Sequence, residues 1–264
     1  MEIFQYTFFR NALWGLILIS IASAVIGTYV VTRRRMFVAG GVTHACFGGL
    51  GLGYFLGISP IAMAGVFAIG SALGVEWLSV RQRLREDSAI SVVWALGMAI
   101  GVLFIFLTPG YVPELNSFLF GNILTIDTAD LWIFAAYVAV LLAAITLFYR
   151  PIVACAFDPD YARTIGMPVQ VINSCMTILV AVCIVLTLQL IGIMMLMSLF
   201  SMPQMIAEVF TNRLRPMMTL AAGISLVCSL AGLFLSYATN VPASATIVII
   251  LILAYIAVRL LHKK

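Results

Sequence analysis

The sequence predicts an all-α polytopic membrane protein, a bundle of about eight to nine transmembrane helices. Of its 264 residues, 64% are hydrophobic and only 9% are charged, whereas a soluble domain is about half apolar and roughly a quarter charged. Basic residues gather in short clusters separated by apolar stretches of about 20 residues, the length that crosses a hydrocarbon core. This composition excludes a soluble globular enzyme, a disordered tail and a nucleic-acid-binding module.

The basic clusters orient the helices. Short loops rich in Lys and Arg stay in the cytoplasm, so each cluster, from Arg33–Arg35 to Lys263 and Lys264, marks an inner end. The spans then alternate in direction, with the first running inward. Residues 169–206 are continuously apolar, so eight spans is the alternative to nine. The nine candidates are Leu13–Thr32, Val38–Gly57, Ile61–Val80, Ser88–Thr108, Leu131–Tyr149, Val169–Gln189, Leu190–Ile206, Met217–Tyr237 and Thr246–Leu261.

Three segments between the spans have their own signals. Pro109–Asn116 is predicted to be an outer loop, and Ser117–Ile126 is too short to cross, so we expect an interfacial or re-entrant piece. The loop 150–168 is predicted to be cytoplasmic. Asp158-Pro159 is typical of a helix start, and Gly166 of a helix stop. A short amphipathic helix of about two turns, suited to docking, is therefore expected there.

Polar residues at membrane depth are few, and they are functional candidates by default. His44 lies nine residues beyond Arg35, which places it roughly 13 Å into the membrane, close to its midplane. It is either a pathway residue or a hydrogen-bonded packing residue. A neutral imidazole binds zinc, manganese or iron, although one ligand does not make a site. Pro203 interrupts a span and favours either packing or a gate, and Asn240 marks an outer turn that is a second candidate gate.

Small residues indicate packing. Gly70 with Gly74 and Gly97 with Gly101 recur one helical turn apart, a spacing that lets helices approach closely in lipid. The five cysteines show no CxxC spacing and are interpreted as small buried hydrophobes.

The sequence lacks the common motifs for nucleotide binding and hydrolysis, which excludes several functions. The only lysines are Lys263 and Lys264, so the phosphate-binding loop GxxxxGK[ST] is absent and any ATP-driven transport requires an ATPase from another polypeptide. The HExxH and GxSxG signatures are absent as well. We therefore expect a transport protein rather than an enzyme.

The loop Phe157–Pro168, with the sequence FDPDYARTIGMP, resembles the "FDPE-aromatic-A…G-hydrophobic-P" segment of permeases from zinc, manganese and iron ABC importers. Weaker matches to the same family follow in its order along the chain. They are Arg34–Met36 with Thr43–Ala45, Glu86–Ser88 with Gly101, Phe118–Leu124, Ile191–Met195 with Pro203, and Asn240–Ala245.

The resemblance implies a single transmembrane permease domain over 1–264, in the bacterial cytoplasmic (inner) membrane. It implies three protein partners: a cytoplasmic ABC ATPase that binds the ATP, an extracytoplasmic metal-binding protein, and a second copy of the chain. The metal ion is the cargo, and no cofactor is held permanently. The family's coupling segment maps to Asp158, Pro159, Ala162 and Gly166.

The chain departs from the family in its predicted pathway. The family's Asp, one helical turn before the histidine, corresponds to Gly40 or Gly41, and the polar residue expected near Ala95 or Leu96 is absent. The remaining donors include His44, Thr43 and Cys46, a set that favours transient passage, a softer metal or a metal complex. A permease for a siderophore or cobalamin, and an ATP-independent secondary transporter, are the alternatives.

Overall fold

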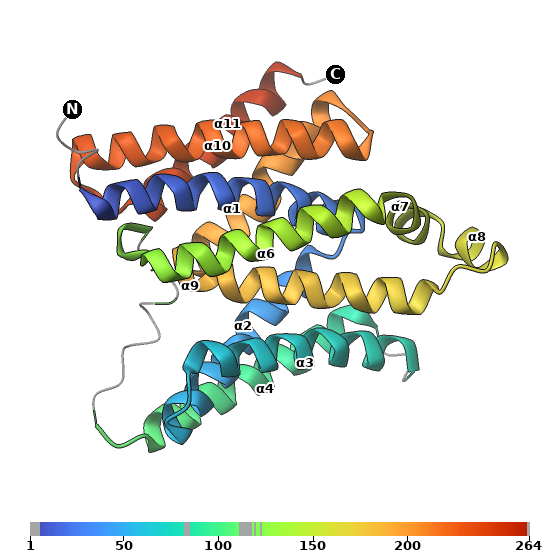
Figure 1. Cartoon of the computed structure of the whole chain (residues 1–264), viewed down its shortest axis with the longest axis horizontal. Coiled ribbons are helices and arrows are strands. Elements are labelled where there is room, and N and C mark those ends of the chain that lie inside the picture. The colour runs from blue at the N-terminus through green and yellow to red at the C-terminus, as the bar shows by residue number, and fades with distance from the viewer. Residues whose placement is uncertain (1–5, 82–84, 111–117, 119, 122, 263–264) are drawn as a thin grey trace. The chain divides into compact units, whose positions relative to one another are not determined.

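The computed structural model describes residues 6–81, 85–110, 118, 120, 121 and 123–262, and in this part of the chain there are helices and no β-strands (Figure 1). The helices are α1 Thr7–Thr32, α2 Met36–Leu56, α3 Pro60–Arg81, α4 Glu86–Leu107, η2 Ile123–Thr125, α6 Thr128–Leu147, α7 Tyr149–Phe157, α8 Pro159–Thr164, α9 Val169–Phe210, α10 Leu214–Thr239 and α11 Ala243–Leu261.

The chain divides into two compact units, each built from separated stretches. The first unit comprises Met1–Thr32, Asn116–Leu141 and Thr187–Lys264, and the second comprises Arg33–Leu115 and Leu142–Leu186. Both α6 and α9 begin in one unit and end in the other. These two boundaries fall inside continuous helices, so no loop or linker marks them in the sequence.

In the first unit, α1 packs against α10 and α10 packs against α11 (Figure 1). Ala24, Ala207, Met217 and Ala221 form a buried cluster of small and flexible side chains. Near the start of α1, the Asn11 side-chain amide donates to the carbonyl of Ile126 at 3.1 Å, which connects α1 to the segment after η2. The core of this unit is thus tied together by polar contacts as well as apolar packing.

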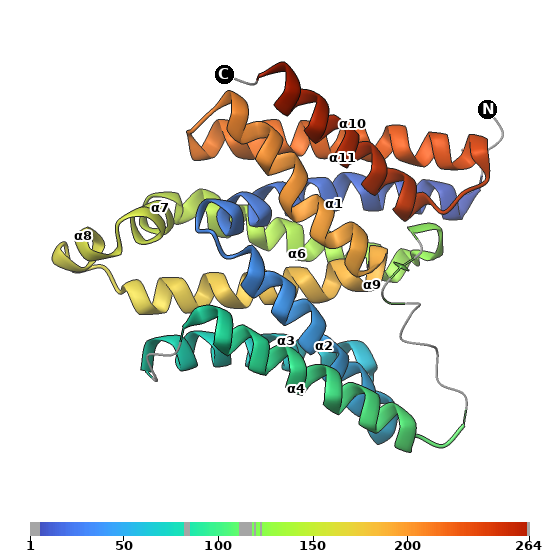
Figure 2. The ribbon, with the colours of Figure 1, turned by 180° about the vertical axis from the view of Figure 1, so that it is seen from behind.

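In the second unit, α2 packs against both α3 and α4 (Figure 2). Near the end of α3 and the start of α4, a buried apolar cluster is formed by Val75, Ala89 and Ile90. The arginine cluster that follows α1 is held by two polar contacts. Arg33 Nη1 donates to Asn173 Oδ1 at 2.9 Å, and Arg35 Nε lies 3.6 Å from Glu86 Oε1.

Eight helices in the described residues are long and apolar enough to cross a membrane, which confirms the predicted fold class. The α9 helix has 42 residues and a path of about 63 Å, roughly twice the thickness of a hydrocarbon core. It breaks at Gly192, where φ is 75° and ψ is 173°. The predicted division between Gln189 and Leu190 was therefore wrong in position, because the continuous apolar pattern hides a break that depends on one glycine.

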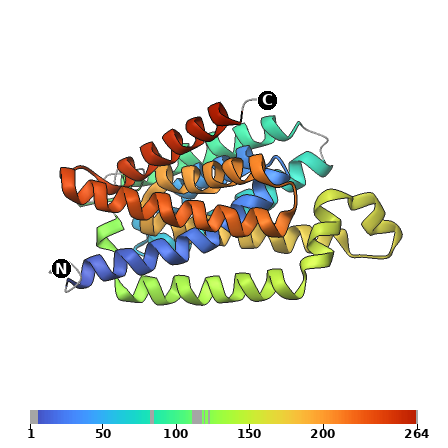
Figure 3. The same ribbon diagram turned by 90° about the horizontal axis from the view of Figure 1, so that it is seen from above.

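The region after α6 also differs from the prediction. Residues 149–157 are helical as α7, so the loop 150–168 holds two helices instead of one. Figure 3 shows α7 and α8 following α6 and leading into the start of α9. Most of the predicted outer loop Pro109–Asn116 lies outside the described residues. In the predicted interfacial segment Ser117–Ile126, the described part contains the 3-10 turn η2.

Candidate functional site

Glycines on α2 let this helix pack closely on two neighbours. Gly48 and Gly51 face Gly97 and Gly101 of α4, where an added Cβ would meet backbone atoms. This confirms that Gly97 and Gly101 serve helix packing. The other predicted pair makes no such contact within the described chain, and its packing role stays a prediction. Gly70 and Gly74 of α3 have no neighbouring atom within 4 Å of an added Cβ.

His44 lies on α2 beside this close contact. Its imidazole stacks on the indole of Trp94 from α4, with ring centroids 4.2 Å apart and planes within 4° of parallel. Phe47, one turn further along α2, lies 6.4 Å from the imidazole. The Nδ1 atom of His44 is buried with no hydrogen-bond partner. A histidine that serves only packing normally has its ring nitrogens satisfied, and this one does not.

The other predicted donors face different surroundings. Thr43 is fully buried and its hydroxyl donates to the Ala39 carbonyl at 2.7 Å. Cys46 is fully buried and its thiol contacts the Val42 carbonyl at 3.1 Å. Both groups are engaged by the backbone of their own helix, so α2 does not bring them together with the His44 ring.

Gly40 and Gly41, the two positions that correspond to the family's Asp, have different surroundings. Gly41 is buried, and an added Cβ would meet the Ile90 side chain at 2.5 Å. Gly40 is half-buried and lies four residues before His44, on the same face of α2. Position 40 therefore shares the His44 side of α2, whereas a side chain at position 41 would meet Ile90.

In the described residues, no group of three or more His, Cys, Asp or Glu side chains is arranged to hold a metal ion. The predicted site thus consists of one imidazole without a second side-chain ligand beside it. Such a site is chemically suited to brief contact with a passing ion, since stable zinc or manganese sites use several ligands.

The α7–α8 region folds as its sequence signals predict. Asp158 caps α8, accepting from the Tyr161 N–H at 2.9 Å, and Pro159 occupies the first turn. Gly166 has a φ of 78°, which suits a residue just beyond a helix end. Ala162 is fully buried and packs with Cys155 and Val169. Asp158, Pro159, Ala162 and Gly166, the four residues predicted to couple to an ATPase, thus build and hold the short helix.

Cys155 belongs to this small core. Burial raises the pKa of its thiol, and the charge of Arg33 opposes the rise. The thiol is 1% exposed and is not part of a disulfide. Its position confirms the interpretation of this cysteine as a small buried hydrophobe. Cys175 on α9 is exposed, so that interpretation was wrong for it.

The sequence predicts a short amphipathic helix in this loop, and the structure shows which apolar side chains are exposed there. Phe157, Tyr161 and Ile165 are 58%, 57% and 49% exposed, respectively. Phe157 is the last residue of α7, Tyr161 lies in α8 and Ile165 follows the end of α8, so the three side chains come from one short stretch of chain. The sequence signals at Asp158, Pro159 and Gly166 indicate where the helix begins and ends, and they do not indicate which apolar side chains are exposed.

Pro203 takes part in a packed polar contact. Proline has no N–H for the Leu199 carbonyl one turn earlier. The Gln204 side-chain amide instead donates to Leu199 O at 3.1 Å and to Ser23 O of α1 at 2.7 Å. Gly27 makes room for this amide, because an added Cβ there would overlap Gln204. The geometry accounts for Pro203 by packing, and its role as a gate stays a prediction.

Three of the weaker family-like segments meet in the first unit. A cavity of about 740 Å³ is lined by Phe120, Gly121, Leu124, Met194, Ser236, Val241, Pro242, Ala243, Ser244, Ala245, Val248 and Ile249. At its edge, Gly121 and Gly192 lie backbone to backbone with positive φ angles of 58° and 75°. Asn240 adopts a left-handed conformation at the end of α10, with φ 54°, and does not line this cavity.

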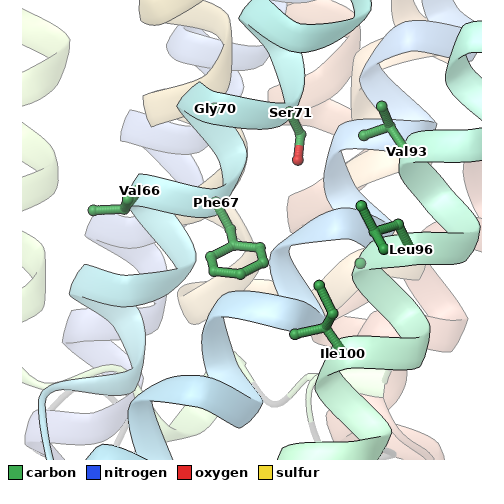
Figure 4. Close-up of a pocket in the computed structure, with 8 residues that line it drawn as sticks. Val66, Phe67, Gly70, Ser71, Val93, Leu96 and Ile100 are labelled. Atoms are coloured by element: carbon green, nitrogen blue, oxygen red, sulfur yellow. The ribbon is translucent and has the colours of Figure 1, made fainter.

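A smaller apolar cavity of about 350 Å³ lies between α3 and α4 (Figure 4). Leu96 lines it, at the position where the family resemblance led us to expect a polar residue. Ser71 is the one side-chain hydroxyl on its wall. Among the lining residues, none supplies a metal ligand, so the cavity does not replace the missing partner of His44.

Comparison with known proteins identifies the class. A family model described as the ABC 3 transport family matches residues 5–262. The chain belongs to this family, which confirms the resemblance to permeases of metal-ion ABC importers. It is a multi-pass protein of the inner membrane.

Individual relatives are similar along almost their whole length. The chain is 38% identical to a membrane protein of Synechocystis, over 97% of this chain and 91% of that protein. It is 31% identical to the manganese transport system membrane protein MntC of Halalkalibacterium halodurans, over 94% of this chain and 85% of that protein. A chain of the solved PsaBC complex from Streptococcus pneumoniae matches with a TM-score of 0.86 and 25% identity, covering 98% of this chain and 93% of that chain.

Proposed function

We propose that the chain is the permease subunit of an ABC importer that moves a divalent metal ion, zinc, manganese or iron, into the cytoplasm. The whole chain acts as one permease domain. ATP hydrolysis takes place on a separate ATPase subunit, an extracytoplasmic metal-binding protein delivers the ion, and a second copy of the chain completes the pore. Manganese is the first metal to test, because it is the metal in the name of a relative.

The observation that carries the proposal is the set of exposed apolar side chains on the α7–α8 segment. A chain without a phosphate-binding loop must receive the energy of ATP hydrolysis through a surface contact. Phe157, Tyr161 and Ile165 provide an apolar surface outside the candidate membrane spans. Large apolar side chains that are exposed outside the lipid are typical of protein interaction sites. The caps at Asp158 and Gly166 support a rigid element that transmits movement.

The passage of the ion is assigned to His44. Its imidazole is half-buried in α2, and its Nδ1 is occupied neither by a carboxylate nor by a backbone carbonyl. A metal-binding histidine in a stable site normally donates its second N–H to such a partner, which makes it a stronger ligand. The lack of that partner favours weak binding and quick release, as transport requires.

Docking is tested with a pair of matched variants. Ile165→Ala removes an apolar side chain that is 49% exposed on the α7–α8 side, and Ile58→Ala removes one that is 52% exposed in the turn after α2. The proposal predicts that Ile165→Ala weakens copurification with the ATPase and lowers its stimulated hydrolysis. Ile58→Ala leaves both unchanged. Equal behaviour of the two variants would remove the docking assignment.

A metal chelate is the second candidate cargo, and the cavity of about 740 Å³ favours it. Ligand pockets typically measure about 300–1,000 Å³. Uptake by vesicles that contain the assembled transporter separates the two cargoes. Import of free radioactive manganese or zinc supports the ion. Import of the same metal only as a siderophore or corrinoid complex supports the chelate.

A further inference from the structure

The proposed ligand His44 is held by an aromatic stack with a residue that belongs to none of the family-like motifs. Trp94 comes from α4, and its indole covers one face of the imidazole at 4.2 Å between centroids. The planes lie within 4° of parallel, so both ring nitrogens point along the stack edge and away from the indole face. Neither N–H can donate to the indole in this geometry. The contact therefore fixes the orientation of the ring without occupying either nitrogen.

Close backbone contact creates the stack. Gly97 lies three residues after Trp94, and an added Cβ at Gly97 would meet the Ala45 Cα atom at 2.5 Å. Ala45 is the residue directly after His44. Because α2 and α4 touch here through backbone, the larger side chains beside the contact are pressed face to face. Trp94 and His44 are those side chains.

The two ring nitrogens of His44 are unequal in this arrangement. Nδ1 is buried and has no hydrogen-bond partner, whereas Nε2 is not a buried, unpaired atom. No hydrogen bond engages Nε2 in the described chain, and His44 is partly exposed, so Nε2 is the nitrogen on the accessible side of the ring. A neutral imidazole that binds a metal through Nε2 carries its proton on Nδ1.

We propose that Trp94 is a positioning residue that holds the His44 ring so that Nε2 alone is presented to the transported ion. Trp94 does not touch the ion. It fixes the ring plane, keeps Nδ1 turned into the protein, and takes over the orienting role that a hydrogen-bonded carboxylate fulfils in ordinary metal sites. The inference rests on the proposed function, because it assigns a positioning role within the same pathway.

Loss of the stack frees the ring to turn about its side-chain bonds. An aromatic pair of this kind accounts for about a threefold to tenfold effect on an equilibrium. We therefore expect Trp94→Leu to raise the KM for metal uptake by about threefold to tenfold, with a smaller change in maximal rate. Trp94→Phe keeps an aromatic face against the imidazole and is expected to restore most of the affinity.

The experiment measures uptake of radioactive manganese and zinc by vesicles that contain the complete transporter. Trp77→Leu is the matched control, because Trp77 is a half-exposed tryptophan on α3 of the same unit. Each variant is made in the wild-type chain, and Trp94→Leu is also made together with His44→Ala. A positioning role predicts that Trp94→Leu raises KM in the wild-type chain and adds no further loss once His44 is alanine.

A merely structural role gives a different pattern. Trp94→Leu would then lower uptake by the same factor with and without His44, and Trp94→Phe would give no rescue of KM. Either result overturns the inference. If His44→Ala impairs uptake while Trp94→Leu leaves KM unchanged, the proposed function stands and the role of Trp94 fails. If the wild-type transporter imports no metal, both fail.

Discussion

The α2–α4 contact of the second unit is made by backbone, whereas the α1–α9 contact of the first unit is made by a polar side chain. Gly97 and Gly101 bring α4 against the main chain of α2. In the first unit, Gln204 reaches across from α9 and donates to the Ser23 carbonyl of α1. Both are ways to join helices in lipid, where apolar side chains gain little by leaving the bilayer.

The two contacts assign different roles to their polar residues. Gln204 provides two hydrogen bonds, one of which satisfies the carbonyl left free by Pro203. Both hydrogen bonds of its amide nitrogen therefore serve helix packing. The His44 ring has no such bond, and the glycine contact around it needs none. A polar side chain that packing does not require is the better functional candidate.

Within the described residues, this contrast extends to the other unsatisfied polar atoms. Those of the first unit are the hydroxyls of Ser20, Thr28, Ser225 and Ser229 and the carbonyl oxygen of Gln204, and His44 Nδ1 is the one in the second unit. Small hydroxyls on facing helices are frequent in membrane bundles. An imidazole is larger and binds metals, so its position is the more informative one.

The largest effect is expected at the break in α9. Gly192→Ala forces a side chain into a conformation that essentially only glycine adopts, and its Cβ would meet the backbone of Gly121. We expect a loss of about 3 kcal/mol in unfolding free energy and little folded protein in the membrane. Gly223→Ala on α10 is the control, because an added Cβ there meets nothing within 4 Å. Thermal unfolding in detergent measures both. Equal stability would show that the break tolerates a side chain.

The α2–α4 contact is broken by Gly97→Val, whose side chain collides with the main chain at Ala45. We expect a loss of about 2 kcal/mol, as for other overpacked cores. Gly74→Val introduces the same side chain on α3, where the space around an added Cβ is open, and should be nearly neutral. Thermal unfolding of the two variants checks this difference. A stable Gly97→Val protein would contradict a backbone-mediated contact.

The polar contact of the first unit is tested by Gln204→Leu. Without the amide, the Leu199 carbonyl is buried and unpaired, and we expect a loss of about 1 to 2 kcal/mol. Ser201→Ala is the control, because the Ser201 hydroxyl donates within its own helix, to the Met197 carbonyl at 2.8 Å. Stability and metal uptake are measured together. Normal stability combined with lost uptake would assign Gln204 and Pro203 to a gate instead of packing.

The smallest effect on stability is expected for Gly40→Asp, which adds a carboxylate one turn before His44. Position 40 is half-buried, so we expect normal folding with stronger retention of manganese and slower release. Gly41→Asp is the contrasting variant, because its side chain would meet Ile90 and disturb the α2–α4 packing. Equilibrium binding of manganese to the purified transporter provides the measurement. If Gly40→Asp leaves retention unchanged, the two positions do not share a metal-accessible face.

The fold class was readable in the sequence because hydropathy and basic clusters act over whole spans. The caps of α8 were readable too, since Asp158-Pro159 and Gly166 carry local conformational signals. The break at Gly192 was misplaced, because its position depends on a backbone contact with Gly121, more than 60 residues away in the chain. The stack of His44 on Trp94 was missed for the same reason. Contacts between helices that are far apart in the chain produce no periodic pattern in the sequence.

The central claim is that His44 alone among the predicted donors of α2 contacts the transported metal. Uptake of radioactive manganese by vesicles with the assembled transporter tests it most directly, in His44→Ala, Thr43→Val and Cys46→Ala. We predict that His44→Ala lowers uptake at least several-fold, with normal copurification of the ATPase. Thr43→Val and Cys46→Ala should transport as the wild type does, because their side chains are buried and bonded within α2. Unchanged uptake by His44→Ala would contradict the account.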